Sequence, residues 1–371
     1  MNMAKAKYTC GPDGYFKTNV WDGTYKDGRK HYIAIRSKKS SADLEKKVAK
    51  FKEQVSNRTQ IRKSDITFLE YARLWKEVFK DNRENGTRTM YDNIIDKHLS
   101  ALSGVQLSNI DRIHLQLVLN NAKGKKRTQE QITMTFNQIL RSAVSDHLFP
   151  SNVAEDIFAN TESVNYKAPE KRPLTSEERE AVFKADFEIQ DKIFVYILYG
   201  CGLRRGEALA LTIFDFNFKT NEVNINKSHE FVNGIPQKKS PKTENGYRSV
   251  PIPEKILPDI KSYVENLKRR NKIYLFTMRC GQPITKSSYD KKWARIKRQM
   301  QAVTDEPINK LTAHVFRHNY CANLCYQIPR VSIKQIAKLM GDTEKMVLEV
   351  YNHILLEKED AVGAVNDAMN F

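Results

Sequence analysis

The chain has 371 residues, of which 62 are Lys or Arg and 44 are Asp or Glu, so its formal charge at pH 7 is +18. Hydrophobic residues make up 40% of the chain and aromatic residues 10%, which is enough apolar surface for packed cores and excludes a globally disordered chain. The length exceeds what a single core usually supports, so we expect two or three domains.

The apolar segments are too short for a membrane protein. The longest apolar run, residues 193–203, has 11 residues and already includes two glycines, whereas a helix needs about 20 to cross a bilayer. The first 14 residues contain no apolar stretch of the kind found in secretory signals. Five scattered cysteines do not make a disulfide framework. These features predict a soluble protein of a reducing compartment, without a membrane partner.

The first 63 residues carry more than half of the net charge. They hold 16 Lys or Arg against six Asp or Glu, a net charge of +10, and such a basic segment favours binding to a polyanion such as nucleic acid. Turn residues at 11–14, 22–23 and 26–28 separate short aromatic and β-branched runs, so we predict a three-stranded sheet followed by a helix over 42–54. A solubilising tail would instead have low complexity, which this segment lacks.

Residues 64–170 have the pattern of an all-helical domain. Thr67 and Glu70 have the spacing of a capping box, which predicts that a helix begins there. The apolar face of that helix consists of Phe68, Ala72, Trp75 and Phe79. Further helices are expected over 89–99, 111–120 and 128–146, with a basic stretch at 123–127 and a loop at 149–152. The stripe expected to be buried on the last helix consists of Ile132, Phe136, Ile139 and Ala143.

Residues 171–371 mix helices and strands, after a linker rich in charge and proline over 165–173. Thr175 and Glu178 have capping-box spacing. The turn signals are Asn233-Gly234 and Asn245-Gly246, and strands are expected near 223–226 and 247–252. Helices are expected over 192–199, 256–268, 288–301, 313–325, 333–339 and 346–351. The whole chain is therefore predicted as multidomain and mainly α, with a small β-sheet domain, an all-helical domain and a mixed α+β domain.

Two adjacent arginines, Arg204 and Arg205, follow a glycine-containing stretch that begins at Gly200. The stretch offers G-x-G but lacks the lysine and hydroxyl residue of a phosphate loop, and it follows a helix, so a nucleotide site is not predicted. Two arginines at a helix start are better suited to hold a phosphate. A surface pair in which Glu207 forms a salt bridge would give the same pattern, and from this segment alone that interpretation is favoured.

His314 and Arg317 are three residues apart, on one face of a predicted helix. An imidazole there could transfer a proton while the guanidinium binds an oxyanion, although H-x-x-R also occurs often by chance. The same helix has a second pattern, at intervals of four, three and four residues, made of His314, His318, Cys321 and Cys325. Four ligands along one straight helix cannot surround a metal as a tetrahedron, so no metal site is predicted.

Tyr351 lies near the C-terminus, before Asn352 and His353. A tyrosine at such a position is far more often part of a core than a nucleophile. Its ordinary pKa of about 10 makes the hydroxyl unreactive unless cations stabilise the phenolate and a base accepts the proton.

Taken together, the order and spacing of these motifs resemble the signature of the tyrosine recombinases. The matching positions are Arg204 in G-L-R-x-x-E, Lys242 in P-K-T with Arg248 downstream, His314 and Arg317 in H-x-x-R, and Tyr351 before Asn-His. The resemblance covers essentially the whole chain and is strongest to the integrases of phages and conjugative transposons. It implies an arm-site DNA-binding domain at 1–63, a helical core-binding domain at 64–170, and a catalytic domain with a C-terminal tail helix at 171–371.

The resemblance also implies a reaction: an integrase that integrates and excises a mobile element through a 3′-phosphotyrosyl intermediate, without a cofactor or metal. The nucleophile would be Tyr351, and Arg204 and Arg317 would bind the non-bridging phosphate oxygens. Lys242 would protonate the 5′-oxygen, and His314 would assist proton transfer at the tyrosine. A surface role is expected for Arg205 and structural support for Glu207.

One position departs from the family pattern. The family has His or Trp about nine residues before the tyrosine, and this chain has Asp342 there. An ionised Asp cannot donate a hydrogen bond to phosphate and would repel it. Two other roles remain open: orienting His314 or an arginine, or staying protonated. We expect an active but slower enzyme.

The resemblance further implies partners and a location. These are double-stranded DNA at core and arm sites, a homotetramer on DNA, an excision factor and a host DNA-bending protein, in the bacterial cytoplasm at the nucleoid. The tail over 354–371 would dock on a neighbouring protomer or on its own domain. Two alternative functions are a type IB topoisomerase, against which the arm-type domain argues, and a DNA-binding protein with an impaired active site.

Overall fold

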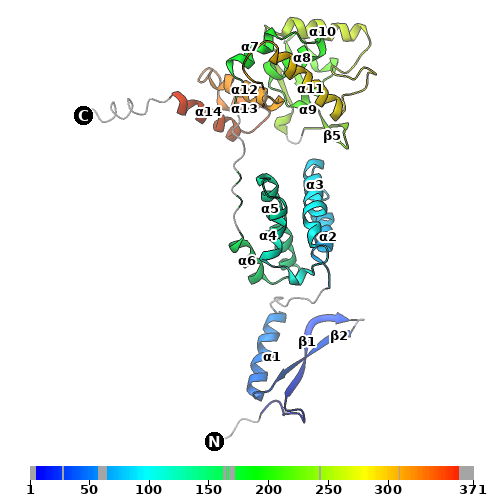
Figure 1. Cartoon of the computed structure of the whole chain (residues 1–371), viewed down its shortest axis with the longest axis vertical. Coiled ribbons are helices and arrows are strands. Elements are labelled where there is room, and N and C mark those ends of the chain that lie inside the picture. The colour runs from blue at the N-terminus through cyan, green and yellow to red at the C-terminus, as the bar shows by residue number, and fades with distance from the viewer. Residues whose placement is uncertain are drawn as a thin grey trace, which may run out of the picture. The chain divides into compact units, whose positions relative to one another are not determined.

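The computed structural model describes residues 6–26, 29–56, 65–161, 164, 166, 172–241, 244–308 and 310–358 (Figure 1). The chain divides into two compact units, Met1–Ala168 and Pro169–Phe371. The mainly helical fold with small antiparallel sheets that the sequence predicts is confirmed. In the part of the chain that the structure describes, no helix is both long and apolar enough to span a membrane.

The first segment is a two-stranded antiparallel sheet that packs on one helix. Strands β1 (Phe16–Lys26) and β2 (Arg29–Ser37) pair with a register shift between Trp21 and Tyr25, and α1 (Ser41–Ser56) follows. A small core joins them, made of Val20, Leu44 and Val48. The expected third strand is reduced, within the described residues, to one bridge between Cys10 and Phe16. The tight turn at 11–14 leaves no room for more pairing, and Pro12 has no N–H to donate.

Among its other described residues, the first unit contains five α-helices: α2 (Phe68–Lys80), α3 (Asn85–Asp92), α4 (Arg112–Asn121), α5 (Lys126–Ser145) and α6 (Ser151–Asn160). A π-helix (Asn93–His98) and a 3-10 helix (Leu99–Leu102) continue α3, and a second short 3-10 helix spans Leu107–Asn109. The capping box at Thr67 is confirmed, because its hydroxyl accepts the Glu70 N–H at 3.2 Å and its own N–H donates to the Glu70 carboxylate at 2.9 Å.

The helical core is mostly the one that the periodicity predicts. The stripe on α5 is fully buried, and Phe68 of α2 lies 4.8 Å from Phe136 between ring centroids. Phe79, by contrast, is 54% exposed, because α2 ends one residue later, beyond the helices that cover its earlier turns. The loop predicted at 149–152 is shorter than expected, because α6 already begins at Ser151. Pro150 holds an extended backbone just before the first turn of that helix.

The second unit combines eight helices and five strands among its described residues. The helices are α7 (Ser176–Lys184), α8 (Ile189–Cys201), α9 (Arg205–Leu209), α10 (Leu257–Arg269), α11 (Lys286–Gln301), α12 (Ala313–Cys325), α13 (Ile333–Met340) and α14 (Glu344–Lys358). A three-stranded antiparallel sheet has the order β3 (Phe216–Asn217), β4 (Glu222–Ile225) and β7 (Arg248–Pro251). Two 3-10 helices span Ile213–Asp215 and Glu244–Gly246.

A separate hairpin, β5 (Ser228–Val232) and β6 (Ile235–Lys239), turns at the predicted Asn233-Gly234 pair. Both turn residues have positive φ, 50° and 81°, as such a tight hairpin turn requires. The capping box at Thr175 is present as well. Helix α8 lies at the centre of the unit, and its residues from Ile193 to Leu198 are all buried. A smaller core joins α12, α13 and α14.

Candidate active site

The turn between α8 and α9 positions Arg204. Gly202 ends α8 in the left-handed conformation, with φ of 61°, and Arg204 then caps α9. Its backbone N–H donates to Glu207 Oε2 at 2.8 Å, and its Nη1 donates to Glu207 Oε1 at 3.0 Å. Its Nη2 reaches the loop after α13, donating to the Gly341 carbonyl at 3.0 Å and to Asp342 Oδ2 at 2.9 Å. The side chain is nevertheless 42% exposed, so one face of the guanidinium remains open to solvent.

Arg317 comes from α12 and is almost completely buried, with 2% of its side chain exposed. Its Nη1 donates to the Gly202 carbonyl at 3.0 Å, and its Nη2 donates to the Met340 carbonyl and to Asp342 Oδ2, the latter at 3.1 Å. Burial, and then the nearby charge of Arg204, lower the pKa of Arg317 to about 10. The guanidinium therefore still carries its charge at neutral pH.

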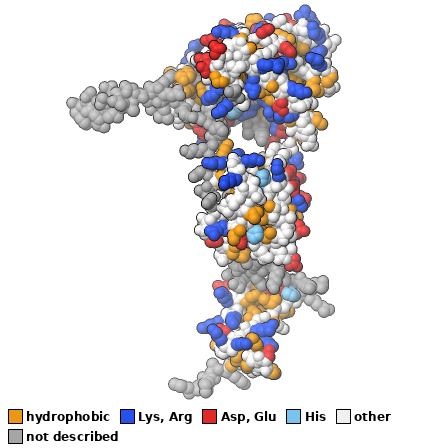
Figure 2. Space-filling view, in the orientation of Figure 1, with side chains coloured by type: hydrophobic (Ala, Val, Ile, Leu, Met, Phe, Trp, Pro, Cys, Tyr) orange, Lys and Arg blue, Asp and Glu red, His pale blue; other side chains and the backbone are white. Residues whose placement is uncertain are grey.

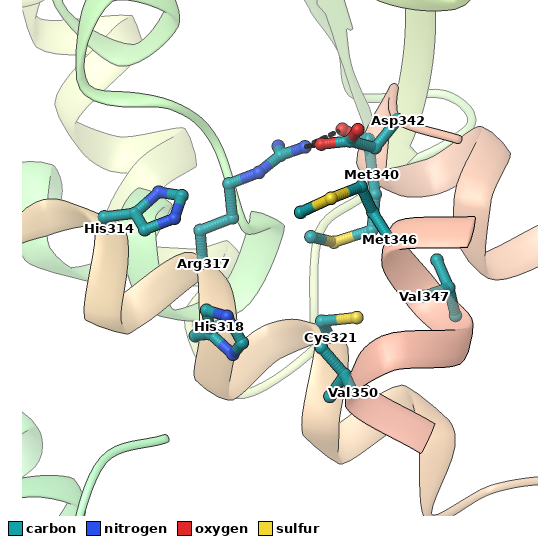
Figure 3. A pocket seen from close by; sticks show the side chains of 9 residues that line it. All are labelled: His314, Arg317, His318, Cys321, Met340, Asp342, Met346, Val347 and Val350. Atoms are coloured by element: carbon teal, nitrogen blue, oxygen red, sulfur yellow. Dashed lines mark hydrogen bonds and ion pairs between the residues drawn. The ribbon is translucent and has the colours of Figure 1, made fainter. Parts of the chain in front are cut away.

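Asp342 lies where these two arginines converge, and Figure 3 shows its contact with Arg317. Helix α13 ends at Met340, and Gly341 turns the chain in the left-handed conformation so that the Asp342 carboxylate faces the arginines. Burial alone would raise the pKa of Asp342, but the Thr343 N–H and the arginine charges outweigh burial and hold the pKa below its usual range. Asp342 is therefore ionised at neutral pH.

Glu207 and Arg248 form a buried pair behind Arg204. Arg248 donates from Nη2 to Glu207 Oε2 at 2.7 Å and from Nη1 to Glu207 Oε1 at 3.1 Å, and its Nε donates to the Leu339 carbonyl at 2.9 Å. Burial acts to raise the pKa of Glu207, but hydrogen bonds and charge from Arg248 outweigh burial and lower the pKa. The pair thus ties the last turn of α13 to α9.

The sequence motif includes Arg248 only as a residue downstream of Lys242 and assigns it no role. Its buried position could have been found from the strand alternation of β7, in which Arg248 and Val250 point inward while Ser249 and Pro251 are exposed. An arginine at an inward position of a strand must have partners inside the protein.

A small hollow of about 30 Å³ lies beside Arg317 and Asp342. Figure 3 shows it between α12, which contributes His314, His318 and Cys321, and α14. Its remaining lining residues are Met340, Met346, Val347 and Val350. His314 is exposed at the first turn of α12, with its ring centroid 5.9 Å from that of His318. Among the described residues, no group of three or more His, Cys, Asp or Glu is arranged to hold a metal ion.

Two described residues of the predicted site, Arg204 and Tyr351, do not line this hollow. Tyr351 follows Val350 on α14, is half-buried, and packs with the core of α12, α13 and α14 without lining the hollow. Lys242 lies outside the described residues. The structure thus brings Arg204, Arg317 and Asp342 into direct contact, and places His314 along the same hollow as the last two.

A second hollow, of about 440 Å³, lies in the helical part of the first unit. It is bordered by the helix that continues α3 and by the start of α5, and its lining includes Lys97, His98 and Lys125 but no acidic residue. Burial, and then the charges of the two lysines, lower the pKa of His98. Lys and Arg side chains are spread over the visible faces of this helical part and of the N-terminal sheet (Figure 2). Such a surface suits a polyanion.

Residues 172–358 match the family described as the phage integrase family. A tyrosine recombinase XerC-like protein from Caldanaerobacter subterraneus subsp. tengcongensis is 23% identical over 98% of each chain. The transposase from transposon Tn916 of Enterococcus faecalis is 26% identical over 49% of this chain and 48% of its own length. Among solved structures, the Tn1549 transposon integrase in complex with a circular intermediate DNA has a TM-score of 0.65 at 18% identity, over 77% of this chain and 95% of that one.

Proposed function

The chain belongs to the phage integrase family and is a tyrosine recombinase, and from this premise we propose how its own residues exchange DNA strands. The recombinase is of the integrase type and acts in the integration and excision of a mobile element. The observation that carries the proposal is the convergence of Arg204 and Arg317 on one anionic oxygen, Asp342 Oδ2, at 2.9 and 3.1 Å. Two guanidinium groups aimed at one oxygen are suited to a phosphate whose charge grows in the transition state.

The proposed step begins with the Tyr351 hydroxyl. Its oxygen attacks the scissile phosphorus and forms a 3′-phosphotyrosyl bond while the bond from phosphorus to the 5′-oxygen breaks. His314 assists removal of the phenol proton, and Lys242 gives a proton to the departing 5′-oxygen. Attack by the 5′-hydroxyl of another strand reverses these steps and releases the tyrosine. Since one phosphodiester replaces another, no cofactor is needed as an energy source.

Tyr351 does not line the hollow, so in the proposed step α14 shifts to bring the Tyr351 hydroxyl to the phosphate. Helix α14 is well placed for such a shift, because Val347 and Val350 already border the hollow that Arg317 and Asp342 line. Chemical groups that are apart without substrate often meet only in the bound complex.

DNA is the proposed partner of all three parts of the chain. We assign arm-site binding to 1–63, core-site binding to 64–170, and catalysis to 171–371 with its C-terminal tail helix. The basic N-terminal sheet and the hollow with Lys97 and Lys125 support the first two assignments, because phosphate contacts by lysines supply much of the affinity for DNA. The working complex would be a homotetramer on two duplexes, with an excision factor and a host DNA-bending protein as further partners.

Covalent trapping tests this function. The full chain is mixed, without metal or nucleotide, with a nicked duplex that carries the end of the DNA element encoding it, and adducts are separated on a denaturing gel. We expect an adduct with the wild type and none with Tyr351→Phe. The matched control is Tyr326→Phe, which alters an exposed tyrosine of the same unit and should leave the adduct unchanged.

The other outcomes are equally informative. An adduct that persists in Tyr351→Phe would place the nucleophile elsewhere. Tight binding without any wild-type adduct would favour the DNA-binding protein with an impaired active site. Relaxation of supercoiled DNA at arbitrary positions, with no exchange between two defined sites, would favour the topoisomerase.

A further inference from the structure

Asp342 takes the hydrogen bonds that a phosphate would need. Its Oδ2 accepts one bond from Arg204 Nη2 and one from Arg317 Nη2, at 2.9 and 3.1 Å. This is the contact that the same two groups would make with a non-bridging phosphate oxygen. The anion bound between the two arginines in this structure is therefore a side chain of the protein itself.

Each of these Nη2 atoms also donates a second hydrogen bond, to the Gly341 carbonyl from Arg204 and to the Met340 carbonyl from Arg317. Arg317 Nη1 is bound to the Gly202 carbonyl, and Arg204 Nη1 is bound to Glu207. A phosphate oxygen thus cannot form charged hydrogen bonds to Arg204 Nη2 and Arg317 Nη2 unless the Asp342 carboxylate gives them up. A carboxylate and a phosphate also repel each other when they share one site, so the two anions cannot occupy it together without proton uptake or movement.

The charge of the site leads to the same conclusion. Three arginines at positions 204, 248 and 317 lie among two carboxylates at 207 and 342, which leaves a net charge of +1. Glu207 is buried and bound by Arg248, so it is fixed. Asp342 is 26% exposed and follows a glycine, so its side chain can turn toward solvent without disturbing a core.

We propose that Asp342 is an internal counter-ion for Arg204 and Arg317, which together form the arginine clamp. Asp342 keeps the two guanidinium groups aligned and occupies their Nη2 donors until the scissile phosphate takes its place. The inference rests on the proposed function and deepens it, because it assigns to Asp342 a positioning role: control of how strongly the site prefers a charged phosphate. Replacing the carboxylate with a neutral group should open the clamp. The resulting gain in affinity for DNA should depend on the negative charge of the scissile phosphate.

The experiment compares two duplexes that differ at one position. One has the normal phosphate at the cleavage position, mapped with the wild-type adduct, and the other has a neutral methylphosphonate there. Dissociation constants are measured for the full chain in a Tyr351→Phe background, so that no covalent product forms. The ratio of the two constants reports how much the protein gains from that one phosphate charge.

We expect Asp342→Asn to increase the preference for the charged duplex by about tenfold, as one charge-assisted hydrogen bond would allow. Asp342→His should also increase the preference for the charged duplex. Because the histidine side chain differs in shape from asparagine, agreement between the two variants excludes a folding artefact. The matched control is Asp290→Asn, which removes the same charge from a 56%-exposed residue paired with Lys286. It should change the affinity for both duplexes by the same factor and leave the ratio of the two dissociation constants unchanged.

An equal ratio in Asp342→Asn and Asp290→Asn would overturn the inference. So would a lower ratio in both variants of Asp342, because Asp342 would then be only a support for the arginines. If the wild type forms no adduct on the same DNA, the proposed function itself fails. If the wild type forms an adduct but Asp342→Asn leaves the ratio of the two dissociation constants unchanged, only the proposed role of Asp342 is contradicted.

Discussion

At the scale of single residues, Arg204 and Arg317 carry the same charge in different surroundings. Arg317 is 2% exposed and donates to two carbonyl groups that end helices α8 and α13, so its loss would destabilise the fold. Arg204 is 42% exposed. A change at Arg204 can therefore test the chemistry with little effect on folding.

We expect Arg204→Lys to slow adduct formation on the nicked duplex by about 100-fold. A lysine keeps the charge but lacks the planar fork that now contacts Glu207, Gly341 and Asp342 together. The midpoint of thermal unfolding should change little. The control, Arg179→Lys, alters an arginine of α7 whose guanidinium donates to Ser176, and it should cleave like the wild type. Adduct formation by Arg204→Lys at the wild-type rate would show that Arg204 has no part in the proposed mechanism.

The order of the motifs predicts which residues carry the chemistry, but it does not show how these residues meet. Arg204, His314 and Arg317 stand in recognisable local motifs. The contact of Asp342 with Arg204 bridges 138 positions of the chain and depends on how the end of α13 packs against the start of α9. No local pattern encodes such a contact.

At the scale of elements, two glycines at helix ends hold the candidate site together. Gly202 ends α8 and Gly341 ends α13, both with φ of 61°. The carbonyl of Gly202 binds Arg317, and that of Gly341 binds Arg204. Capping boxes such as those at Thr67 and Thr175 were predictable because all of their contacts are local. The arginine pair indicates where α9 starts, but a helix of five residues is too short for apolar periodicity to show its extent.

Gly341→Ala should both destabilise the second unit and abolish adduct formation. A Cβ at this position would lie 2.7 Å from Arg248 Nη1 and 2.8 Å from the Asn245 carbonyl oxygen, in a backbone conformation that costs other residues about 1–2 kcal/mol. The matched control is Gly281→Ala, where φ is +83° but no atom lies within 4 Å of the new Cβ. It should show the backbone cost alone in chemical unfolding and still cleave DNA. Equal losses in both variants would mean that the contacts around Gly341 contribute nothing.

At the scale of the whole molecule, length correctly suggested more than one compact unit, and the chain forms two. The three-part division remains a prediction, because 57–64 and most of 162–171, around both expected boundaries, lie outside the described residues. Separate cores exist for the N-terminal sheet and for the helices that follow it. This separation supports the proposal that the two parts bind different stretches of DNA.

A chain beginning at residue 65 should therefore keep one activity and lose another. It retains the arginine clamp and the hollow with Lys97 and Lys125, so we expect adduct formation on a short nicked duplex at close to the rate of the full chain. On a longer fragment, nuclease footprinting should show a second protected stretch with the full chain only. Identical footprints would contradict arm-site binding by 1–63. Loss of adduct formation by a folded truncated chain would show that the N-terminal part serves catalysis directly.

The hydrogen-bond acceptors around the clamp have a genetic consequence. Arg204 and Arg317 are oriented by the carbonyls of Gly202, Met340 and Gly341, which no substitution can delete, and by Glu207, which is locked to Arg248. Asp342 is the remaining acceptor, and an aspartate codon becomes a histidine or an asparagine codon by one base change. A single point mutation could therefore reset how readily this recombinase engages DNA, while the rest of the site keeps its geometry. The mobility of the element could thus be adjusted at one codon.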